Sequence, residues 1–310
     1  MMKKILILAL VLILHQLSAL QPSYCATISK FTVSPTSISL PDQDPDAFAE
    51  VSSQTNLIVD FSIRQFSSTE NWVLELYSDG NLISGSDSIP IGNVRWTVTG
   101  SGSPPGTFLN RNFVQGAYVE AGRGPGDKPV NGKADITCYF TFYLSNLWSY
   151  ATGNYSKAIT VRLTVPGAVQ SLTFTLSTSI TSRASLQFGG LTISFPNANP
   201  DSFPSIPSSL NPVSVTSNMR TASSSTRTLS CLASGDLVSG GDTIPIANMS
   251  WQATGSGYVL GTMSRTSGQT AGSWTGPGTK TGAFDYFLAN SWSYAIGVYS
   301  AGVTYTLTAP

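Results

Sequence analysis

Residues 80–102 read GNLISGSDSIPIGNVRWTVTGSG, and residues 235–257 read GDLVSGGDTIPIANMSWQATGSG. These two stretches match without a gap at 14 of 23 positions, at a constant offset of 155 residues. Residues 148–155 and 292–299 share the pattern Trp-Ser-Tyr-Ala-x-Gly-x-Tyr at an offset of 144, so the second copy is 11 residues shorter between these anchors (155 − 144). Chance does not produce such matches, and the chain therefore contains one module twice.

Apolar residues alternate with polar ones in many short segments, such as residues 159–163 and 303–307. This period of two is typical of half-buried strands, and no useful length shows helical spacing after the N-terminus. We therefore expect an all-β chain of two tandem immunoglobulin-like antiparallel β-sandwich domains, residues 27–168 and 169–310. The alternating segment 172–176 could close the first domain or open the second. The shared tryptophans, Trp96/Trp251 and Trp148/Trp292, are expected to anchor the two cores.

The N-terminus begins Met-Met-Lys-Lys and continues with an apolar run from Ile5 to Leu14. A short basic start followed by an apolar run of this length predicts a secretory signal peptide, residues 1–26, with its cleavage site left open. No later stretch reaches the roughly 20 apolar residues of a membrane-spanning helix. We therefore expect a secreted or cell-surface protein without a membrane span in the mature chain.

Composition excludes several classes of function. The charged residues amount to 10% of the chain and the net charge is zero, which removes the basic surface that nucleic-acid binding requires. The single histidine, His15, lies in the predicted signal peptide, so the mature chain cannot form a Ser–His–Asp or Cys–His catalytic system. Cys138 and Cys231 fall in different copies and are expected to be buried thiols, although a cross-link between the copies stays open. An enzyme is not expected; a hydrolase that uses only carboxylates ranks third among the functions considered.

One loop carries carboxylates at alternate positions: Asp42, Asp44 and Asp46. Oxygen-rich calcium loops show this spacing, and calcium is the one cofactor that the sequence suggests. The second copy has Asn197, Asn199 and Asp201 at the same places. The alternative is a solvated turn in which Asp side chains cap backbone amides.

Two tryptophans, Trp72 and Trp274, have no counterpart in the other copy. A tryptophan that the shared core does not need is a candidate for an exposed platform that stacks on a sugar ring. The alternative for Trp72 is packing on an edge strand, which leaves Trp274 as the better candidate for ligand binding.

The pattern Trp-Ser-Tyr-Ala-x-Gly-x-Tyr, followed by an alternating last strand, resembles bacterial pilin-type and spore coat protein U-type sandwich domains. In pilins of the chaperone–usher class a glycine fourteen residues from the end precedes the final strand. Gly297 is fourteenth counted from Pro310, and Gly153 is fourteenth counted back from Pro166. Ala309 stands where such pilins have a penultimate aromatic residue, and the paired cysteines are missing. The resemblance implies an exported surface or appendage component.

Taken together, the sequence favours a non-catalytic bacterial surface or appendage protein with a structural or adhesive role. Its partners would be further copies of itself or other surface proteins. The competing hypothesis is a carbohydrate-binding module whose loop aromatics contact an extracellular glycan.

Overall fold

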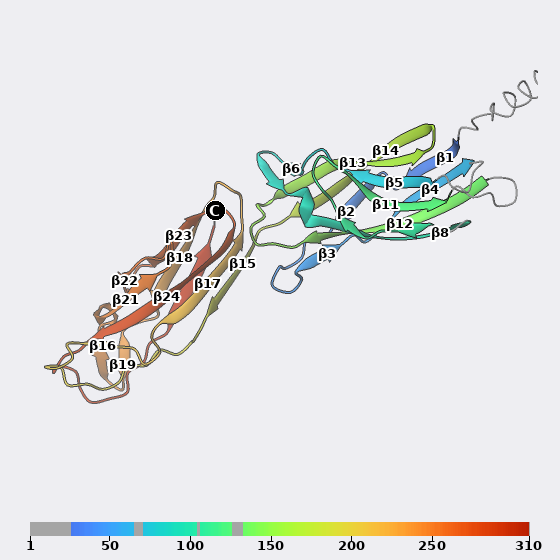
Figure 1. Ribbon diagram of the computed structural model, residues 1–310. Helices are drawn as coiled ribbons and strands as arrows, with labels where there is room; N and C mark the ends of the chain where they lie inside the picture. Colours follow the sequence, from blue (N-terminus) through green and yellow to red (C-terminus); the bar gives the residue numbers. More distant parts are fainter. Residues whose placement is uncertain (1–25, 65–70, 104–105, 126–132, 310) are drawn as a thin grey trace, which may run out of the picture.

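The computed structural model describes residues 26–64, 71–103, 106–125 and 133–309, and the predicted signal peptide lies almost entirely outside them. Within these residues the chain is all-β and forms two tandem sandwiches (Figure 1), which confirms the predicted fold class. We call residues 26–180 the first domain and residues 183–309 the second domain.

Two sheets face each other in the first domain, with strand order β1-β4-β12-β8-β10 in one and β2-β14-β13-β5-β11-β9 in the other. The first sheet contains β1 (Thr27–Ser34), β3 (Glu50–Ser52), β4 (Leu57–Arg64), β8 (Val94–Ser103), β10 (Arg111–Asn112) and β12 (Lys133–Ser145). The second contains β2 (Ser37–Leu40), β5 (Asn71–Tyr77), β6 (Leu82–Ser84), β7 (Asp87–Ile89), β9 (Thr107–Phe108), β11 (Tyr118–Pro125), β13 (Gly153–Val165) and β14 (Ala168–Ile180). A short 3-10 helix, η1 (Ile91–Asn93), follows β7.

The second domain repeats this plan with fewer strands. One sheet has the order β15-β17-β24-β21-β22 with β16 beside β24; the other has only three strands, β23-β18-β25. Their bounds are β15 (Arg183–Phe188), β16 (Ser205–Pro207), β17 (Val213–Arg220), β18 (Thr226–Ala233), β21 (Met249–Thr254), β22 (Gly261–Thr262), β23 (Gln269–Thr275), β24 (Gly278–Ala289) and β25 (Val303–Thr308). A separate hairpin, β19 (Leu237–Ser239) and β20 (Asp242–Ile244), precedes the 3-10 helix η2 (Ile246–Asn248).

The duplicated stretch that opens the sequence forms the same local structure in both domains. It contains a two-strand hairpin, a 3-10 turn and a long strand: β6, β7, η1 and β8 in the first domain, and β19, β20, η2 and β21 in the second. Gly85 and Gly240 have φ angles of 59° and 60° at the hairpin turns, a conformation that glycine adopts without steric cost. Trp96 and Trp251 in the following strands are buried, which confirms them as core anchors.

The segment whose domain the sequence left open belongs to the first domain. Strand β14 pairs along its whole length with β13 and runs parallel to β2, so it completes the second sheet of that sandwich. Strand β14 pairs only with β13 and β2 of the first sandwich, and β15, which begins at Arg183, is the first strand that pairs within the second.

Candidate functional site

No strand of the described residues occupies, in the second domain, the place that β14 holds in the first. In the first domain β13 is a 13-residue strand between β14 and β5. Its equivalent, β25, is only 6 residues long and pairs on one side alone, with β18. Residues 192–195, the equivalent of β2, form no strand in the second domain. One edge of the three-stranded sheet is therefore open.

A groove of about 1350 Å³ lies along this open edge. Its walls are apolar side chains from both sheets and from the unpaired segments. They include Ile193, Phe195, Ile206, Leu237, Ile244, Ile246, Met249, Met263, Leu288 and Val303. The equivalents of the first two, Ile38 and Leu40, are fully buried in the first domain, where their strand β2 pairs with β14. The groove is thus core surface that the second domain leaves uncovered.

The repeated pattern Trp-Ser-Tyr-Ala-x-Gly-x-Tyr shows what the open edge does to identical residues. Tyr150 and Tyr155 are buried in the first domain, where Tyr155 lies opposite Thr178 of β14. Their equivalents, Tyr294 and Tyr299, are half-exposed and line the groove. Near them, Ile296 and Val298 are almost fully exposed. The second domain therefore presents apolar surface of the kind that marks an interaction site.

Two tyrosine hydroxyls meet inside the groove, between its two sheets. The Oη atoms of Tyr286 on β24 and Tyr305 on β25 are 2.7 Å apart, and both residues line the groove. Burial raises the pKa of Tyr286 to about 12 and raises the pKa of Tyr305 as well. Both phenols are therefore neutral hydrogen-bonding groups at physiological pH.

Such a site can bind an extended polypeptide. An edge strand offers unpaired backbone groups for hydrogen bonds, and a row of apolar pockets accepts alternate side chains of the added strand. Strand β14 demonstrates the arrangement within this molecule: Phe174, Leu176, Thr178 and Ile180 point inward and are buried, while the residues between them are exposed or half-exposed.

The two tryptophans predicted to bind ligand are both buried. Trp72 is fully buried in the first core, and Trp274 is only 6% exposed in the second. The indole nitrogen of Trp274 donates a hydrogen bond to the carbonyl oxygen of Ser256 at 2.7 Å. Neither indole presents the open face that stacking on a sugar requires, so this geometry gives the glycan-binding hypothesis no support at these two residues.

These tryptophans turn out to be structural equivalents on neighbouring strands. Trp72 of β5 pairs with Gly124 of β11, whereas in the second domain Arg227 of β18 pairs with Trp274 of β23. Each indole covers glycines: a Cβ added to Gly124 would lie 2.6 Å from the Trp72 ring, and one added to Gly272 would lie 2.4 Å from the Trp274 ring. The same position in the core is thus filled by an indole from β5 in the first domain and by an indole from β23 in the second.

The buried Arg227 lies beneath this second indole. Its guanidinium carbon is 5.4 Å from the centre of the Trp274 ring, and its Nη1 donates to the carbonyl oxygen of Gly278 at 2.5 Å. Desolvation lowers its pKa.

The carboxylates predicted to bind calcium take part in separate interactions. Asp44 accepts a hydrogen bond from the backbone amide of Asp46 at 2.9 Å, and Asp46 accepts one from the indole nitrogen of Trp148 at 2.8 Å. Asp42 forms an ion pair with Arg220 of the second domain. Among the described residues no cluster of three or more His, Cys, Asp or Glu side chains is placed to hold a metal ion. Calcium binding at this loop stays a prediction, which titration of the chain with calcium tests.

The joint between the domains is built around Arg220, which is fully buried. Its Nη1 donates to Asp42 Oδ1 at 2.6 Å, its Nη2 to Asn146 Oδ1 at 2.5 Å, and its Nε to the carbonyl oxygen of Leu147 at 3.0 Å. Desolvation lowers the pKa of the guanidinium, and the nearby Asp42 charge offsets part of that effect. Arg220 and Asp42 are 178 residues apart, so no local pattern in the sequence indicated this role.

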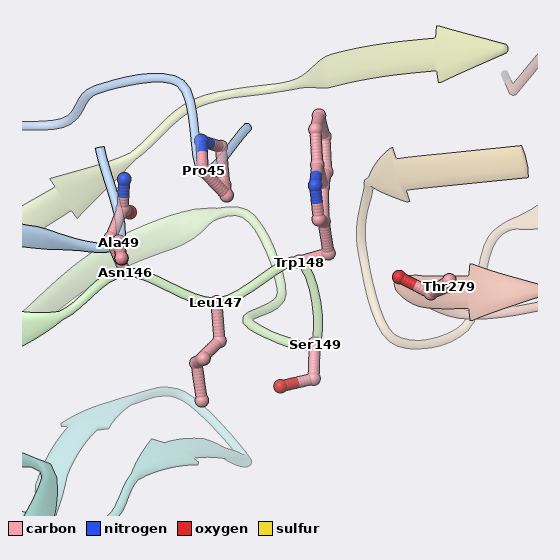
Figure 2. A pocket seen from close by; sticks show the side chains of 7 residues that line it. All are labelled: Pro45, Ala49, Asn146, Leu147, Trp148, Ser149 and Thr279. Atoms are coloured by element: carbon pink, nitrogen blue, oxygen red, sulfur yellow. The ribbon is translucent and has the colours of Figure 1, made fainter. Parts of the chain in front are cut away.

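Beside Arg220 a shallow pocket of about 490 Å³ separates the loop of the first domain from β24. Figure 2 shows Trp148 between Pro45 and Thr279 in this pocket. Trp148 is half-buried at the joint, while its equivalent Trp292 is 70% exposed at the far end of the second domain. The expectation that this pair anchors the cores was wrong: each indole instead donates to an Asp of the adjacent loop, Asp46 or Asp201.

Cys138 and Cys231 are free and buried, so these two residues do not cross-link the domains. Burial raises the pKa of Cys138 to about 12 and that of Cys231 to about 11. Among the described residues no helix is long and apolar enough to cross a membrane.

No family model and no curated protein matches this chain. Among solved structures, it is similar to the CupB6 tip adhesin from Pseudomonas aeruginosa, with 10% identity, a TM-score of 0.32, and coverage of 92% of this chain and 96% of that one. It is similar to a CsuC–CsuE chaperone–tip adhesion subunit complex from Acinetobacter baumannii, with 12% identity, a TM-score of 0.30, and coverage of 90% and 99%. The CooA pilin subunit from enterotoxigenic Escherichia coli is 12% identical, with a TM-score of 0.31 and coverage of 51% and 99%. At such low identities and TM-scores we assign no residue role from these similarities.

Proposed function

We propose that this chain is a non-catalytic subunit of a bacterial surface assembly, and that its second domain joins the assembly by taking up a β-strand from another polypeptide. The observation that carries this proposal is the difference between the domains. One sandwich holds the 13-residue strand β14 between β13 and β2, and the other has an apolar groove at the same place. The first domain, with its sandwich complete, is left free to face outward from the assembly.

The physical reason is the free energy of covering the groove. Burial of a large aliphatic side chain contributes about 1.5–3 kcal/mol, and an added strand would bury several such side chains on both itself and the groove walls. Its backbone would also pair with the open edge of β25. The exposed Ile296 and Val298 beside the groove would gain cover in the same step.

A direct test extends the chain after Pro310 with a copy of residues 167–180. Pro310 aligns with Pro166, after which the first domain turns into β14, so the copy enters the groove in the same register. Position 174 of the copy is varied among Phe, Ser and Ala. A side chain that does not fit at this one position then does not prevent detection of binding by the rest of the copied strand. We expect at least one version to raise the melting temperature of the second domain by roughly 10 °C.

The matched control is the same extension with Leu176 and Ile180 of the copy replaced by Asp, which cannot enter an apolar groove. If none of the three versions stabilises the second domain more than this control does, the groove does not accept a strand and the proposal fails. Calorimetry of the full chain separates the two domains by their melting transitions.

A further inference from the structure

Strand pairing fixes which residues of the two domains are equivalent around the groove. Tyr286 lies opposite Trp251 as Phe142 lies opposite Trp96, and Tyr305 lies opposite Cys231 as Val161 lies opposite Leu76. By the same criterion Phe188, opposite Val215, is the equivalent of Val33, opposite Val59. Three positions of the first core thus carry larger or more polar side chains in the second domain.

In the first domain an aromatic ring from β14 fills this region. The ring of Phe174 lies 5.3 Å from that of Phe142, centroid to centroid, and Phe174 is buried. Phe174 lies opposite Ile159 of β13, and small side chains stand at Val161, two residues further along the same face of β13, and at Val33 of β1.

In the second domain aromatic rings stand at the equivalents of Val33 and Val161. The ring of Tyr305 lies 4.8 Å from that of Phe188 and 6.0 Å from that of Phe284, so it reaches across from its own sheet to the opposite one. Replacement of Leu76 by Cys231 beside it leaves some room, but both Tyr305 and Phe188 still line the groove. A phenyl group added where Phe174 sits would overpack this end of the groove, which typically costs stability.

The polarity of this end of the groove also differs from that of the equivalent region in the first domain. The hydroxyls of Tyr286 and Tyr305 bind each other at 2.7 Å, where the first domain has only hydrocarbon from Phe142 and Val161. A hydroxyl has one hydrogen to donate and two lone pairs that accept, so the pair retains acceptor capacity. A serine or threonine hydroxyl on an incoming strand can donate to it, whereas a phenyl ring cannot.

We propose that Tyr286, Tyr305 and Phe188 make the groove select a partner strand with a small, hydroxyl-bearing side chain at the position that Phe174 occupies in β14. This inference rests on the proposed function, since it concerns the strand that the groove accepts. Strand β14 of a second copy carries Phe at this position, so it is a poor occupant. The three side chains thus direct the second domain toward a different polypeptide and away from exchange of β14 between identical chains.

The test compares two extensions after Pro310, one copying residues 167–180 unchanged and one with Phe174→Ser within the copy. We expect the Ser version to melt about 5 °C higher than the Phe version, because it avoids overpacking and bonds to the hydroxyl pair. The same two extensions are then placed on a chain carrying Tyr305→Val, which restores the small residue of the first domain. There the order should reverse, with the Phe version melting higher.

The comparison within each background removes the effect of Tyr305→Val on the domain itself. Equal or higher stability of the Phe version on the unchanged chain would overturn the selectivity and leave strand uptake intact. An order that stays the same in the Tyr305→Val chain would overturn the role of Tyr305. If neither of these extensions nor the Ala version stabilises the domain more than the Asp-substituted control does, the proposed function fails instead.

Discussion

The same sequence pattern is buried in one domain of this molecule and partly exposed in the other. Tyr155 of the first domain is buried against β14, while Tyr299 of the second is half-exposed at the wall of an apolar groove. The local sequences are alike, so the difference comes from a neighbouring strand and not from the residues themselves. Strand β13 is paired on both sides and is 13 residues long, whereas β25 is paired on one side and is only 6 residues long. A strand can thus depend on its neighbour for its length as well as its burial.

The largest effect is expected when β14 loses its buried aromatic side chain. We expect Phe174→Ala to destabilise the first domain by about 3–5 kcal/mol, because it removes a buried ring and leaves a cavity against Phe142. Denaturant unfolding measures the loss. Thr175→Ala, an outward-facing neighbour, should change stability by less than about 0.5 kcal/mol. Similar losses for the two variants would show that β14 does not contribute through its inward face.

The next largest effect is expected when the contact between the two domains at Arg220 is removed. Arg220→Ala leaves Asp42 and Asn146 without their buried partner and should cost about 3 kcal/mol, with the two melting transitions moving apart. Calorimetry of the full chain detects both changes. Arg265→Ala removes an exposed ion pair with Asp236 and should cost less than about 1 kcal/mol. A loss for Arg220→Ala as small as that would contradict the joint described above.

Trp72 and Trp274, which fill the same position of the core from neighbouring strands, allow a third test with a smaller expected effect. Gly124→Ala brings a methyl group to 2.6 Å from the Trp72 ring and should cost the first domain about 1–3 kcal/mol. Gly80→Ala is the control, since its nearest neighbour is the flexible end of Lys157 at 3.5 Å. Urea unfolding of both variants tests this, and an unchanged midpoint for Gly124→Ala would show that the ring has room to move.

Alkaline pH should destabilise the second domain through Tyr286. The pKa of Tyr286 is raised to about 12 by burial, whereas an unfolded tyrosine ionises near 10. The unfolded state therefore loses its proton first, and stability declines as the pH rises from about 10 to 12. At pH 11 this one residue should account for about 1.4 kcal/mol.

Tyr286→Phe should flatten this decline, and the slope of stability against pH is the measurement, because it is independent of the lost hydroxyl contact at neutral pH. A slope identical to that of the unchanged chain would mean that Tyr286 does not titrate with unfolding. The equivalent Phe142 has no proton to lose, so the first domain has no such contribution at this position.

The sequence predicted the duplication, the tandem sandwiches and the burial of Trp96 and Trp251, because strand alternation and matched anchors are local signals. It could not predict the groove, since an alternating segment such as residues 172–176 looks the same whether its neighbour is present or absent. Trp72 and Trp274 looked unmatched because an alignment compares a strand with its copy, while these indoles replace each other across two neighbouring strands. The local spacing of carboxylates around Asp42 suggested a calcium site. The residue that Asp42 contacts in the structure, Arg220, is remote in sequence and could not be recognised from that pattern.

The exchange of these indoles between strands also bears on how the two halves can evolve. If recombination between the duplicated halves moved only the strand β23 into the place of β11, Trp274 would meet Trp72 where glycine now leaves room. The reverse transfer would set Gly124 beside Arg227 and remove the ring that covers its guanidinium. The first transfer would destabilise the core by steric crowding, and the second would do so by leaving a buried charge without its covering ring. The two halves are free to diverge, and sequence exchange between them is held back by their own cores.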